Sequence, residues 1–269
     1  MTKSKKTAAL LLAAGLGTRL APLTDSWPKC LMPIKDVPLL EYWLKMLGDV
    51  GIEDITVNLH HHAEIVQAFL KRPKFSSSIK SLYEPILLGT AGTLRKNAVF
   101  FKDKTCLLVH ADNLCCCDFK KFIDYHHSNR PAKTVMTMMT FESPTPSSCG
   151  VVELDNEGIV YGYHEKVLDP PSNLSNAAVY LLEPEVIDWV IENENAMDFS
   201  NEIIPEFMGR IATWENTGVH RDIGTYAMLH AGQHDNCSQI DIDINTEDEW
   251  QNDFMNNSIH EQIKSVIHG

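Results

Sequence analysis

The residues with the clearest chemical potential lie near the amino terminus, between positions 10 and 34. Gly15 and Gly17 follow an apolar run, and glycines at such a point let the backbone turn tightly with its amide groups facing phosphate oxygens. Arg19 and Lys29 add two cations to the same stretch. The combination predicts a loop that binds a triphosphate, with its cations where a departing pyrophosphate would gather charge.

Two better-known phosphate-binding patterns do not fit this stretch. A dinucleotide-binding turn needs a third glycine where Leu20 stands, and it tolerates no arginine in the turn. The Walker A pattern needs Gly-Lys-Ser or Gly-Lys-Thr, and neither follows Gly17.

The elements that must position this loop alternate over the first half of the chain. Helices are predicted by apolar residues at helical spacing and strands by short apolar or alternating runs. The predicted strands are 8–14, 55–59, 79–83, 106–110 and 134–140, and the predicted helices are 39–47, 63–70, 91–100 and 119–127. Such alternation implies parallel pairing through crossover helices. The expected fold class is α/β, a Rossmann-like doubly wound, mixed and mostly parallel sheet.

The pattern changes after position 141. Residues 149–166 predict two strands joined by a tight turn, a small antiparallel lobe appended to the sheet. A strand is expected at 176–182, and helices at 184–191 and 200–211. Residues 238–269 carry seven acidic residues and one lysine, so they predict an acidic extension.

The charge balance limits the partners. The 23 Lys and Arg face 36 Asp and Glu, a net charge of −13, whereas a nucleic-acid binder needs a basic face. The longest apolar stretch, 8–16, is too short to span a bilayer, so neither nucleic acid nor membrane is an expected partner. Lys3, Lys5 and Lys6 before it imitate a secretory signal, but the glycine loop favours a retained strand. Seven cysteines without disulfide spacing favour a reducing cytoplasm.

Three further runs are interpreted as structural. A His-His-His run at a strand-to-helix junction favours a loop or cap role over a metal site, because adjacent residues point different ways. A Cys-Cys-Cys run lacks the spacing of zinc thiolates and is expected to pack beside Asp112. A methionine run is expected to fill the core. These residues are His60, His61 and His62; Cys115, Cys116 and Cys117; and Met136, Met138 and Met139.

The glycine loop resembles the opening signature of the sugar-1-phosphate nucleotidylyltransferase family, a strand followed by Gly-x-Gly-Thr-Arg-Leu and then Pro-Lys. The matching residues here are 15–20 and 28–29. The resemblance, which covers about residues 8–232, implies that Arg19 and Lys29 are catalytic and hold the triphosphate. It implies a nucleotidyltransferase domain over 1–237, with a nucleotide-binding half of about 1–140 and a sugar-binding part of about 141–237, followed by the extension 238–269.

Residues 84–94 are similar to the family's base-recognition segment. The resemblance implies a nucleotide-binding set of Ala13, Ala14, Gly15, Gly17, Thr18, Glu84, Gly89 and Thr90. A carboxylate at Glu84 would accept hydrogen bonds from N1–H and the exocyclic amine of guanine, which favours GTP. The alternative is that Glu84 faces solvent and the backbone alone reads the base.

Two aspartates match the family's metal pair. Asp112 follows the strand 106–110, at the edge where α/β sheets bind ligands, and Asp222 lies in a segment similar to Trp-x-Asp-x-Gly-Thr. The resemblance implies that they hold Mg²⁺, which hard carboxylates suit. Taken singly, each aspartate would be interpreted as a cap or turn residue.

Residues of the antiparallel lobe match the family's sugar site. The resemblance implies that Glu165 and Asn176 bind sugar hydroxyls, that Lys166 holds the sugar phosphate, and that Gly150 belongs to the same site. An exposed ion pair is the alternative for Glu165 and Lys166. The chain departs from the family pattern at Ala111, Val167, Ala178 and His220, and a methyl group at Ala178 would narrow the sugar pocket.

The implied reaction joins a nucleoside triphosphate, with GTP favoured, to the 1-phosphate of mannose or a related hexose or heptose. The expected partners are these two substrates, in a cytoplasmic monomer or small homo-oligomer. One alternative is a cytidylyltransferase acting on an alcohol phosphate such as phosphocholine, which Glu165 and Asn176 disfavour. The other is a non-catalytic nucleotide-sugar sensor, which the joint presence of Arg19, Lys29, Asp112 and Asp222 disfavours.

Overall fold

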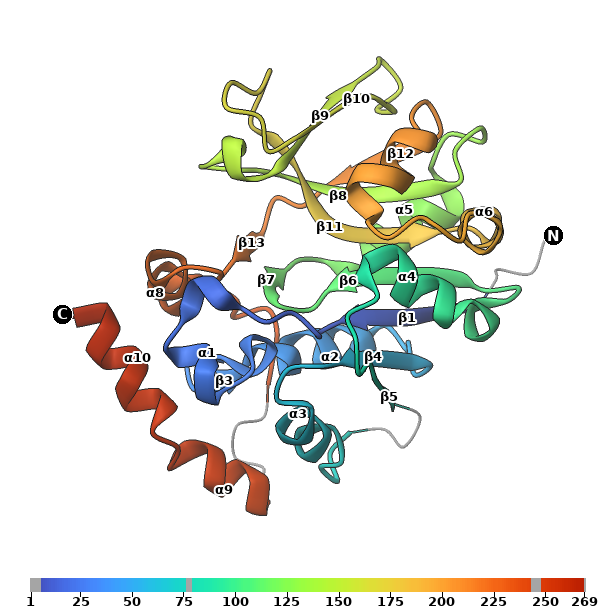
Figure 1. Cartoon of the computed structure of the whole chain (residues 1–269). Coiled ribbons are helices and arrows are strands. Elements are labelled where there is room, and N and C mark those ends of the chain that lie inside the picture. Colours follow the sequence, from blue (N-terminus) through green and yellow to red (C-terminus); the bar gives the residue numbers. More distant parts are fainter. Residues whose placement is uncertain (1–5, 76–78, 243–247, 269) are drawn as a thin grey trace. The chain divides into compact units, whose positions relative to one another are not determined.

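The computed structural model describes residues 6–75, 79–242 and 248–268. It has a mixed α/β fold that divides into two compact units, each built from several segments (Figure 1). Unit 1 takes in the chain up to Leu10, Leu88–Val109 and Asp118–Thr217. Unit 2 takes in Leu11–Leu87, His110–Cys117 and the chain from Gly218 onward. The nucleotide-binding half of about 1–140 and the sugar-binding part of about 141–237 are divisions by function, and they stay a prediction.

Unit 1 contains most of the antiparallel structure. Its strands are β6 (Thr105–His110, whose last residue belongs to unit 2), β8 (Met136–Glu142), β9 (Gly150–Leu154), β10 (Val160–Glu165), β11 (Leu174–Leu182) and β12 (Ile211–Glu215). β11 pairs antiparallel with β6, β8 and β9, while β12 pairs parallel with β8. The hairpin of β9 and β10 confirms the predicted turn, because the Asp155 side chain accepts hydrogen bonds from the amides of Glu157 and Ile159, both at 2.9 Å.

The helices of unit 1 are α4 (Gly89–Lys96), α5 (Phe119–Ser128), α6 (Pro184–Glu192) and the short α7 (Ile204–Glu206). Asp118 caps α5 by accepting the Lys121 amide at 3.1 Å, and Pro184 begins α6 at a position that needs no amide donor. The predicted helix 200–211 is wrong in its second half. The chain leaves the helical conformation after Glu206, turns at Gly209 with φ 81°, and continues as β12.

Unit 2 holds parallel strands and most of the remaining helices. Its strands are β2 (Pro33–Ile34), β3 (Val37–Pro38), β4 (Ile55–Leu59), β5 (Ile79–Tyr83), β7 (Asn113–Cys116) and β13 (Val219–Asp222). Its helices are α1 (Leu23–Ser26), α2 (Leu39–Asp49), α3 (Ala63–Leu70), α8 (Tyr226–His234), α9 (Glu249–Met255) and α10 (Ile259–His268). β4 pairs parallel with β5, and β13 pairs antiparallel with β7.

Strand β1 (Thr7–Leu12) runs through both units, ending in unit 2. At the start of β6, the Thr105 amide donates to the Lys6 carbonyl at 3.1 Å, and just beyond its end the Ala111 amide donates to the Leu12 carbonyl at 3.0 Å. The two bonds advance in the same direction along both segments, so this pairing is parallel. The strand confirms the buried-strand prediction for the apolar run, whereas Lys3 and Lys5 lie outside the described residues.

The cores of both units are apolar. Met136, Met138 and Met139 of β8 are fully buried, as predicted. The extension is helical over α9 and α10, and Phe254 of α9 stacks on Trp27 with ring centroids 5.9 Å apart. Residues 243–247 and 269 of the extension lie outside the described residues. Among the residues described, each helix is too short or too polar to cross a bilayer.

Candidate active site

The glycine loop of unit 2 has the tight turn expected from its sequence. Gly17 has φ 64° and precedes the 3₁₀ turn Thr18–Leu20, in which the Leu20 amide donates to the Gly17 carbonyl at 2.8 Å. A Cβ atom on Gly17 would come within 2.8 Å of Thr24 Cγ2. Thr24 Oγ1 also donates to the Gly17 carbonyl at 3.0 Å, so Thr24 fixes the loop from α1.

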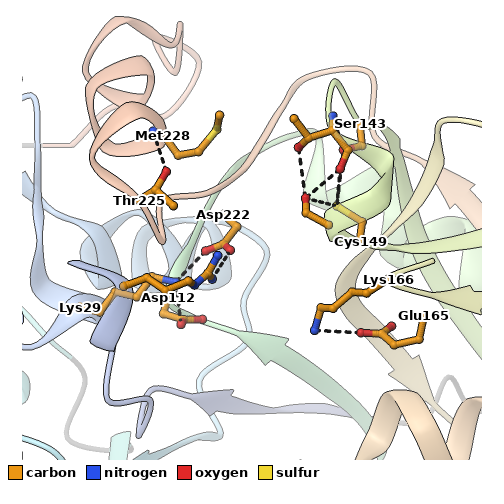
Figure 2. A network of polar contacts seen from close by, with 12 residues as sticks. Lys29, Asp112, Ser143, Cys149, Glu165, Lys166, Asp222, Thr225 and Met228 are labelled. Atoms are coloured by element: carbon orange, nitrogen blue, oxygen red, sulfur yellow. Dashed lines mark hydrogen bonds and ion pairs between the residues drawn. The ribbon is translucent and has the colours of Figure 1, made fainter. Parts of the chain in front are cut away.

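Four predicted residues of unit 2 meet in one charged cluster (Figure 2). The Lys29 Nζ atom lies 2.9 Å from Asp112 Oδ2 and 2.7 Å from Asp222 Oδ1. Arg19 Nη2 lies 2.8 Å from the other oxygen of Asp222. Lys29 and Asp222 are therefore in direct contact, although they lie 193 residues apart in the sequence.

The charges of the cluster determine its protonation. Lys29 has 6% of its side chain exposed; this burial lowers its pKa, but Asp112 and Asp222 outweigh the burial and raise the pKa above its usual value. Burial raises the pKa of Asp222, yet Lys29 and Arg19 outweigh this effect and hold it at about 2. At neutral pH, Lys29 and Asp222 are therefore both charged.

The β7–β13 pair positions the two carboxylates. Asp112 lies in the turn between β6 and β7, and Asp222 ends β13 opposite Asn113 in the strand register. The Asn113 carbonyl accepts the Trp43 indole N–H at 2.9 Å, which anchors β7 to α2. Thr225 caps α8 by accepting the Met228 amide at 3.3 Å, so the chain leaves β13 along a fixed path (Figure 2).

The geometry at the two carboxylates suits a hard divalent cation. Both already converge on one cationic nitrogen, and the glycine at position 224 leaves room for the Arg19 guanidinium that pairs with Asp222. A Cβ atom on Gly15 would lie 3.6 Å from Asp112 Oδ2, and one on Gly224 would lie 2.9 Å from Asp222 Oδ1. Carboxylates in such a setting, with phosphate oxygens and water completing the shell, are the ligands that Mg²⁺ takes in nucleotide sites.

The predicted base-recognition residues divide between the units. In unit 2, Glu84 has only 1% of its surface exposed, and its Oε1 accepts from Asn58 Nδ2 at 3.3 Å. Asn58 Oδ1 in turn accepts the Ala13 amide at 2.8 Å. The alternative in which Glu84 faces solvent is therefore wrong, and direct recognition of guanine by Glu84 stays a prediction.

Gly89 and Thr90 belong to unit 1. Gly89 has φ 73°, and a Cβ atom there would lie 2.3 Å from the Met197 carbonyl. Thr90 Oγ1 accepts the Phe199 amide at 2.7 Å. Both residues fasten the start of α4 to the segment that precedes α7.

The predicted sugar residues form a second cluster, within unit 1, of which Figure 2 shows the Glu165–Lys166 pair. Lys166 Nζ lies 3.0 Å from Glu165 Oε1, and the Tyr163 hydroxyl donates to Glu165 Oε2 at 2.5 Å. Asn176 Nδ2 lies 3.4 Å from the Tyr163 hydroxyl and 2.6 Å from that of Tyr180. Burial raises the pKa of both tyrosines, so both hydroxyls stay protonated.

Two backbone features shape this cluster. A Cβ atom on Gly150 would lie 2.1 Å from the Tyr163 hydroxyl and 2.7 Å from Glu165 Oε2, so only glycine fits there. Ala178, which departs from the family's glycine, has φ 53°, a conformation that costs a non-glycine residue energy. Its amide donates to Asn176 Oδ1 at 2.9 Å, so the bend fixes the orientation of the Asn176 amide group.

The expectation that the cysteines form no disulfide is wrong. Cys116 of β7 is bonded to Cys237, and the other described cysteines are not in a disulfide. The two residues are 121 positions apart, so no local spacing could have indicated the bond. Next to Cys237, Asp235 receives Arg221 of β13 through two hydrogen bonds, of 2.5 and 2.7 Å. The bonded segment therefore holds β7, which follows Asp112, and β13, which ends at Asp222.

Several residues that complete these clusters were not singled out in the sequence. Tyr163 shares its strand face with Glu165 at a spacing of two, a signal that the sequence does contain. Asn58 is a polar residue in an otherwise apolar buried strand, which is a weaker signal. Thr24 and Tyr180 act through contacts that the sequence gives no way to anticipate.

Comparison with known proteins identifies what this chain is similar to. The family profile described as "Nucleotidyl transferase" matches residues 8–239. A UTP–glucose-1-phosphate uridylyltransferase of Synechocystis is 31% identical over 214 residues, which cover 74% of this chain and 55% of that protein. A mannose-1-phosphate guanylyltransferase of Mycobacterium tuberculosis is 29% identical, covering 81% of this chain and 61% of that protein. The chain thus spans little more than half the length of these relatives.

A solved structure shares the fold. A protein of Bacillus anthracis assigned as a glucose-1-phosphate thymidylyltransferase, crystallised with a sucrose, superimposes with a TM-score of 0.76 at 22% identity. The match covers 91% of this chain and 99% of that one.

Proposed function

Since the chain belongs to the nucleotidyl transferase family, we propose that it transfers a nucleotidyl group from a nucleoside triphosphate to a sugar 1-phosphate. The products would be a nucleoside diphosphate sugar and pyrophosphate. The observation that carries the proposal is the cluster of Lys29, Arg19, Asp112 and Asp222 beside the Gly17 turn. It combines cations for phosphates with carboxylates for a metal ion, which is the equipment that nucleotidyl transfer needs.

The proposed chemistry is an in-line substitution at the α-phosphorus. A nonbridging oxygen of the sugar phosphate forms the new bond, and the bond from the α-phosphorus to the oxygen of the leaving pyrophosphate breaks. Arg19 and Lys29 neutralise the charge that gathers on the pyrophosphate, while Lys166 binds the sugar phosphate. No general base is needed, because the sugar phosphate is already ionised at neutral pH.

Asp112 and Asp222 would hold Mg²⁺, which supplies charge neutralisation at the α-phosphate when bound. Lys29 occupies both carboxylates in the structure, so Lys29 must turn toward the phosphates when substrate binds. In the structure the two carboxylates raise the pKa of Lys29, so Lys29 enters that exchange as a cation.

We propose GTP and mannose 1-phosphate, or the 1-phosphate of a related hexose or heptose, as the substrates. The similarity to mannose-1-phosphate guanylyltransferases supports this choice, while the similar uridylyltransferase makes UTP the first competitor. Glu165 and Asn176 offer acceptors and donors for sugar hydroxyls, and Tyr163 holds Glu165 in place.

The decisive experiment measures pyrophosphate release with all common nucleoside triphosphates against a panel of sugar 1-phosphates. Turnover that requires Mg²⁺ is expected for at least one pair, and D112N should lower it by at least a hundredfold. D49N is the matched control, because Asp49 is an exposed partner of Lys45 in α2. Nucleotide binding without turnover for any pair would favour the sensor, and turnover of CTP with phosphocholine would favour the cytidylyltransferase.

We further propose a cytoplasmic monomer or small homo-oligomer. The Cys116–Cys237 disulfide is unusual for a reducing compartment, so the thiol content of the protein isolated from cells tests this assignment.

A further inference from the structure

The His60–His62 run is not used by the chemistry proposed above, yet it occupies a position next to it. The run connects β4 to α3 at the carboxyl end of β4, in unit 2. His62 stands at the cap position of α3 with φ 50°, but its side chain makes no capping hydrogen bond. The predicted loop or cap role is confirmed for the backbone of the run, but the His62 ring caps no amide and is directed elsewhere.

All three imidazoles contact backbone carbonyl oxygens. His61 Nε2 lies 2.8 Å and His62 Nε2 lies 3.0 Å from the Thr24 carbonyl oxygen. His60 Nδ1 lies 2.7 Å from the Glu84 carbonyl oxygen. A carbonyl only accepts hydrogen bonds, so each of these nitrogens must carry a proton and donate it. The two rings on Thr24 are packed together, with centroids 3.9 Å apart.

These contacts end on the residue that holds the glycine loop. Thr24 Oγ1 donates to the Gly17 carbonyl, and the Thr24 methyl group fills the space beside Gly17. Gly17 begins the turn that carries Arg19. Two imidazole donors on the Thr24 carbonyl therefore fix a residue whose side chain fixes the turn.

The third contact reaches the base-recognition segment. The Glu84 carbonyl accepts a hydrogen bond from His60, and the Glu84 side chain accepts one from Asn58. Asn58 in turn accepts the Ala13 amide at the start of the glycine loop. The run thus ties the loop at two points, through Thr24 and through Glu84. If the histidines had a purely structural role, replacing them would lower the stability of the fold. The contacts described here predict instead that replacing them changes the conformation of the glycine loop.

We propose that His61 and His62 are positioning residues for the triphosphate, acting through Thr24 on the Gly17 turn and on Arg19. The proposal rests on the proposed function in one respect, that the loop binds a nucleoside triphosphate. The donated protons matter, since they hold the Thr24 carbonyl, and the imidazole rings need not touch the nucleotide.

The test compares nucleotide affinity in a set of full-length variants by isothermal titration calorimetry with each common nucleoside triphosphate, GTP and UTP first. H61A/H62A removes both donors, and its dissociation constant should rise about tenfold or more, the scale of two net hydrogen bonds. H61Q/H62A restores one donor, because a glutamine amide nitrogen reaches as far as Nε2, and should recover part of the affinity. H230A is the matched control, an exposed histidine of α8 in the same unit, and should bind as the wild type does.

The outcomes separate the proposal from its premise. If the wild type binds none of the common nucleoside triphosphates, the proposed function fails. If the wild type binds and H61A/H62A binds equally well, the positioning role is overturned. A role confined to folding is indicated if H61Q/H62A is as weak as H61A/H62A and both lose thermal stability in proportion, and this also overturns the proposal. The KM for the sugar 1-phosphate should stay within about twofold in H61A/H62A, because the sugar cluster makes no use of Thr24.

Discussion

Replacing Lys29 with methionine is the most informative single change, because it removes one charge and keeps most of the side-chain volume. The ammonium group contacts two carboxylates at 2.9 and 2.7 Å, and the side chain is 6% exposed. Removing one partner of a fully buried ion pair costs about 3–5 kcal/mol. Here the carboxylates are 25% and 45% exposed, and Arg19 still neutralises Asp222. We therefore expect a loss of about 2 kcal/mol in the free energy of unfolding.

The functional loss should be larger than the loss of stability. A preorganised group aimed at developing charge contributes about a hundred- to a thousandfold to kcat, so K29M should lose this factor in pyrophosphate release. Its Tm should fall by about 5 °C, from a shift of about 2–4 °C per kcal/mol in a protein of this size. K45M removes a half-buried surface lysine that contacts the exposed Asp49 one helical turn away. It should change Tm by less than about 2 °C and leave kcat unchanged.

A pH titration gives a second signature of the same contact. The pKa of Asp222 is about 2 in the folded protein, below its usual value of 3.8, so the folded state binds this proton more weakly than the unfolded state. The contribution of the ionised Asp222 carboxylate to the free energy of unfolding is complete above about pH 4 and is lost as the pH falls toward 2. K29M should lose less stability over this interval than the wild type. A K29M variant with wild-type kcat would refute the catalytic role, and one with wild-type Tm would refute the energetic reasoning.

Three further results are expected. Without reductant, a thiol titration of the denatured protein should find five free thiols among its seven cysteines, whereas seven thiols would exclude the disulfide. C237S should lower the free energy of unfolding by up to about 5 kcal/mol, because the disulfide closes a loop of 121 residues. Burial and the neighbouring Arg130 outweigh Glu183 and lower the pKa of His126, so its contribution to stability is complete above about pH 6.5 and is lost on acidification. The difference in unfolding free energy between wild type and H126N should thus shrink from pH 7 to pH 5 in urea titrations, whereas a constant difference would contradict the assignment. A178G should raise the free energy of unfolding by about 0.5 kcal/mol, because glycine adopts the positive φ at this position without strain. A177G, at the buried neighbouring position, should lower it by about 1 kcal/mol or more. A lower free energy of unfolding in A178G would mean that the methyl group of Ala178 packs favourably.

The sequence predicts the parts of the site that depend on neighbouring residues. The glycine turn follows from Gly17 beside a buried strand, and the β9–β10 hairpin follows from Asp155 and Gly158 between alternating residues. Asp112 is predictable as well, because it comes directly after a strongly apolar strand. In each case the residues that determine the local conformation lie within a few positions of one another.

The remainder depends on contacts between distant segments. Residues 199–207 carry apolar side chains at helical spacing, but the helix gives way to β12 because Ile211–Glu215 can pair with β8. The burial of Glu84 results from its pairing with Asn58, 26 positions away. The disulfide joins positions that only the β7–β13 pairing and α8 bring together. Local pattern carries no information about such partners.

The charged cluster also determines how nucleotide and metal ion should bind. Arg19 contacts Asp222, and Lys29 contacts both Asp112 and Asp222. If the two cations turn to a bound triphosphate, the negative charges of both aspartates lose their partners. Two unit charges 4 Å apart interact by about 4 kcal/mol at an effective dielectric constant of about 20, so these carboxylates oppose nucleotide binding unless a cation compensates them.

The double variant D112N/D222N tests this coupling with an unusual sign. In EDTA it should bind GTP, or the triphosphate that the wild type binds most tightly, about tenfold more tightly than the wild type does, because the opposing charges are gone. Adding Mg²⁺ should then strengthen binding to the wild type and leave the double variant nearly unchanged. D49N, which removes an exposed carboxylate of α2, should behave as the wild type in both conditions. Equal affinities in EDTA would mean that Arg19 and Lys29 keep their carboxylates when the triphosphate binds, and the exchange of partners proposed for Lys29 would then be wrong.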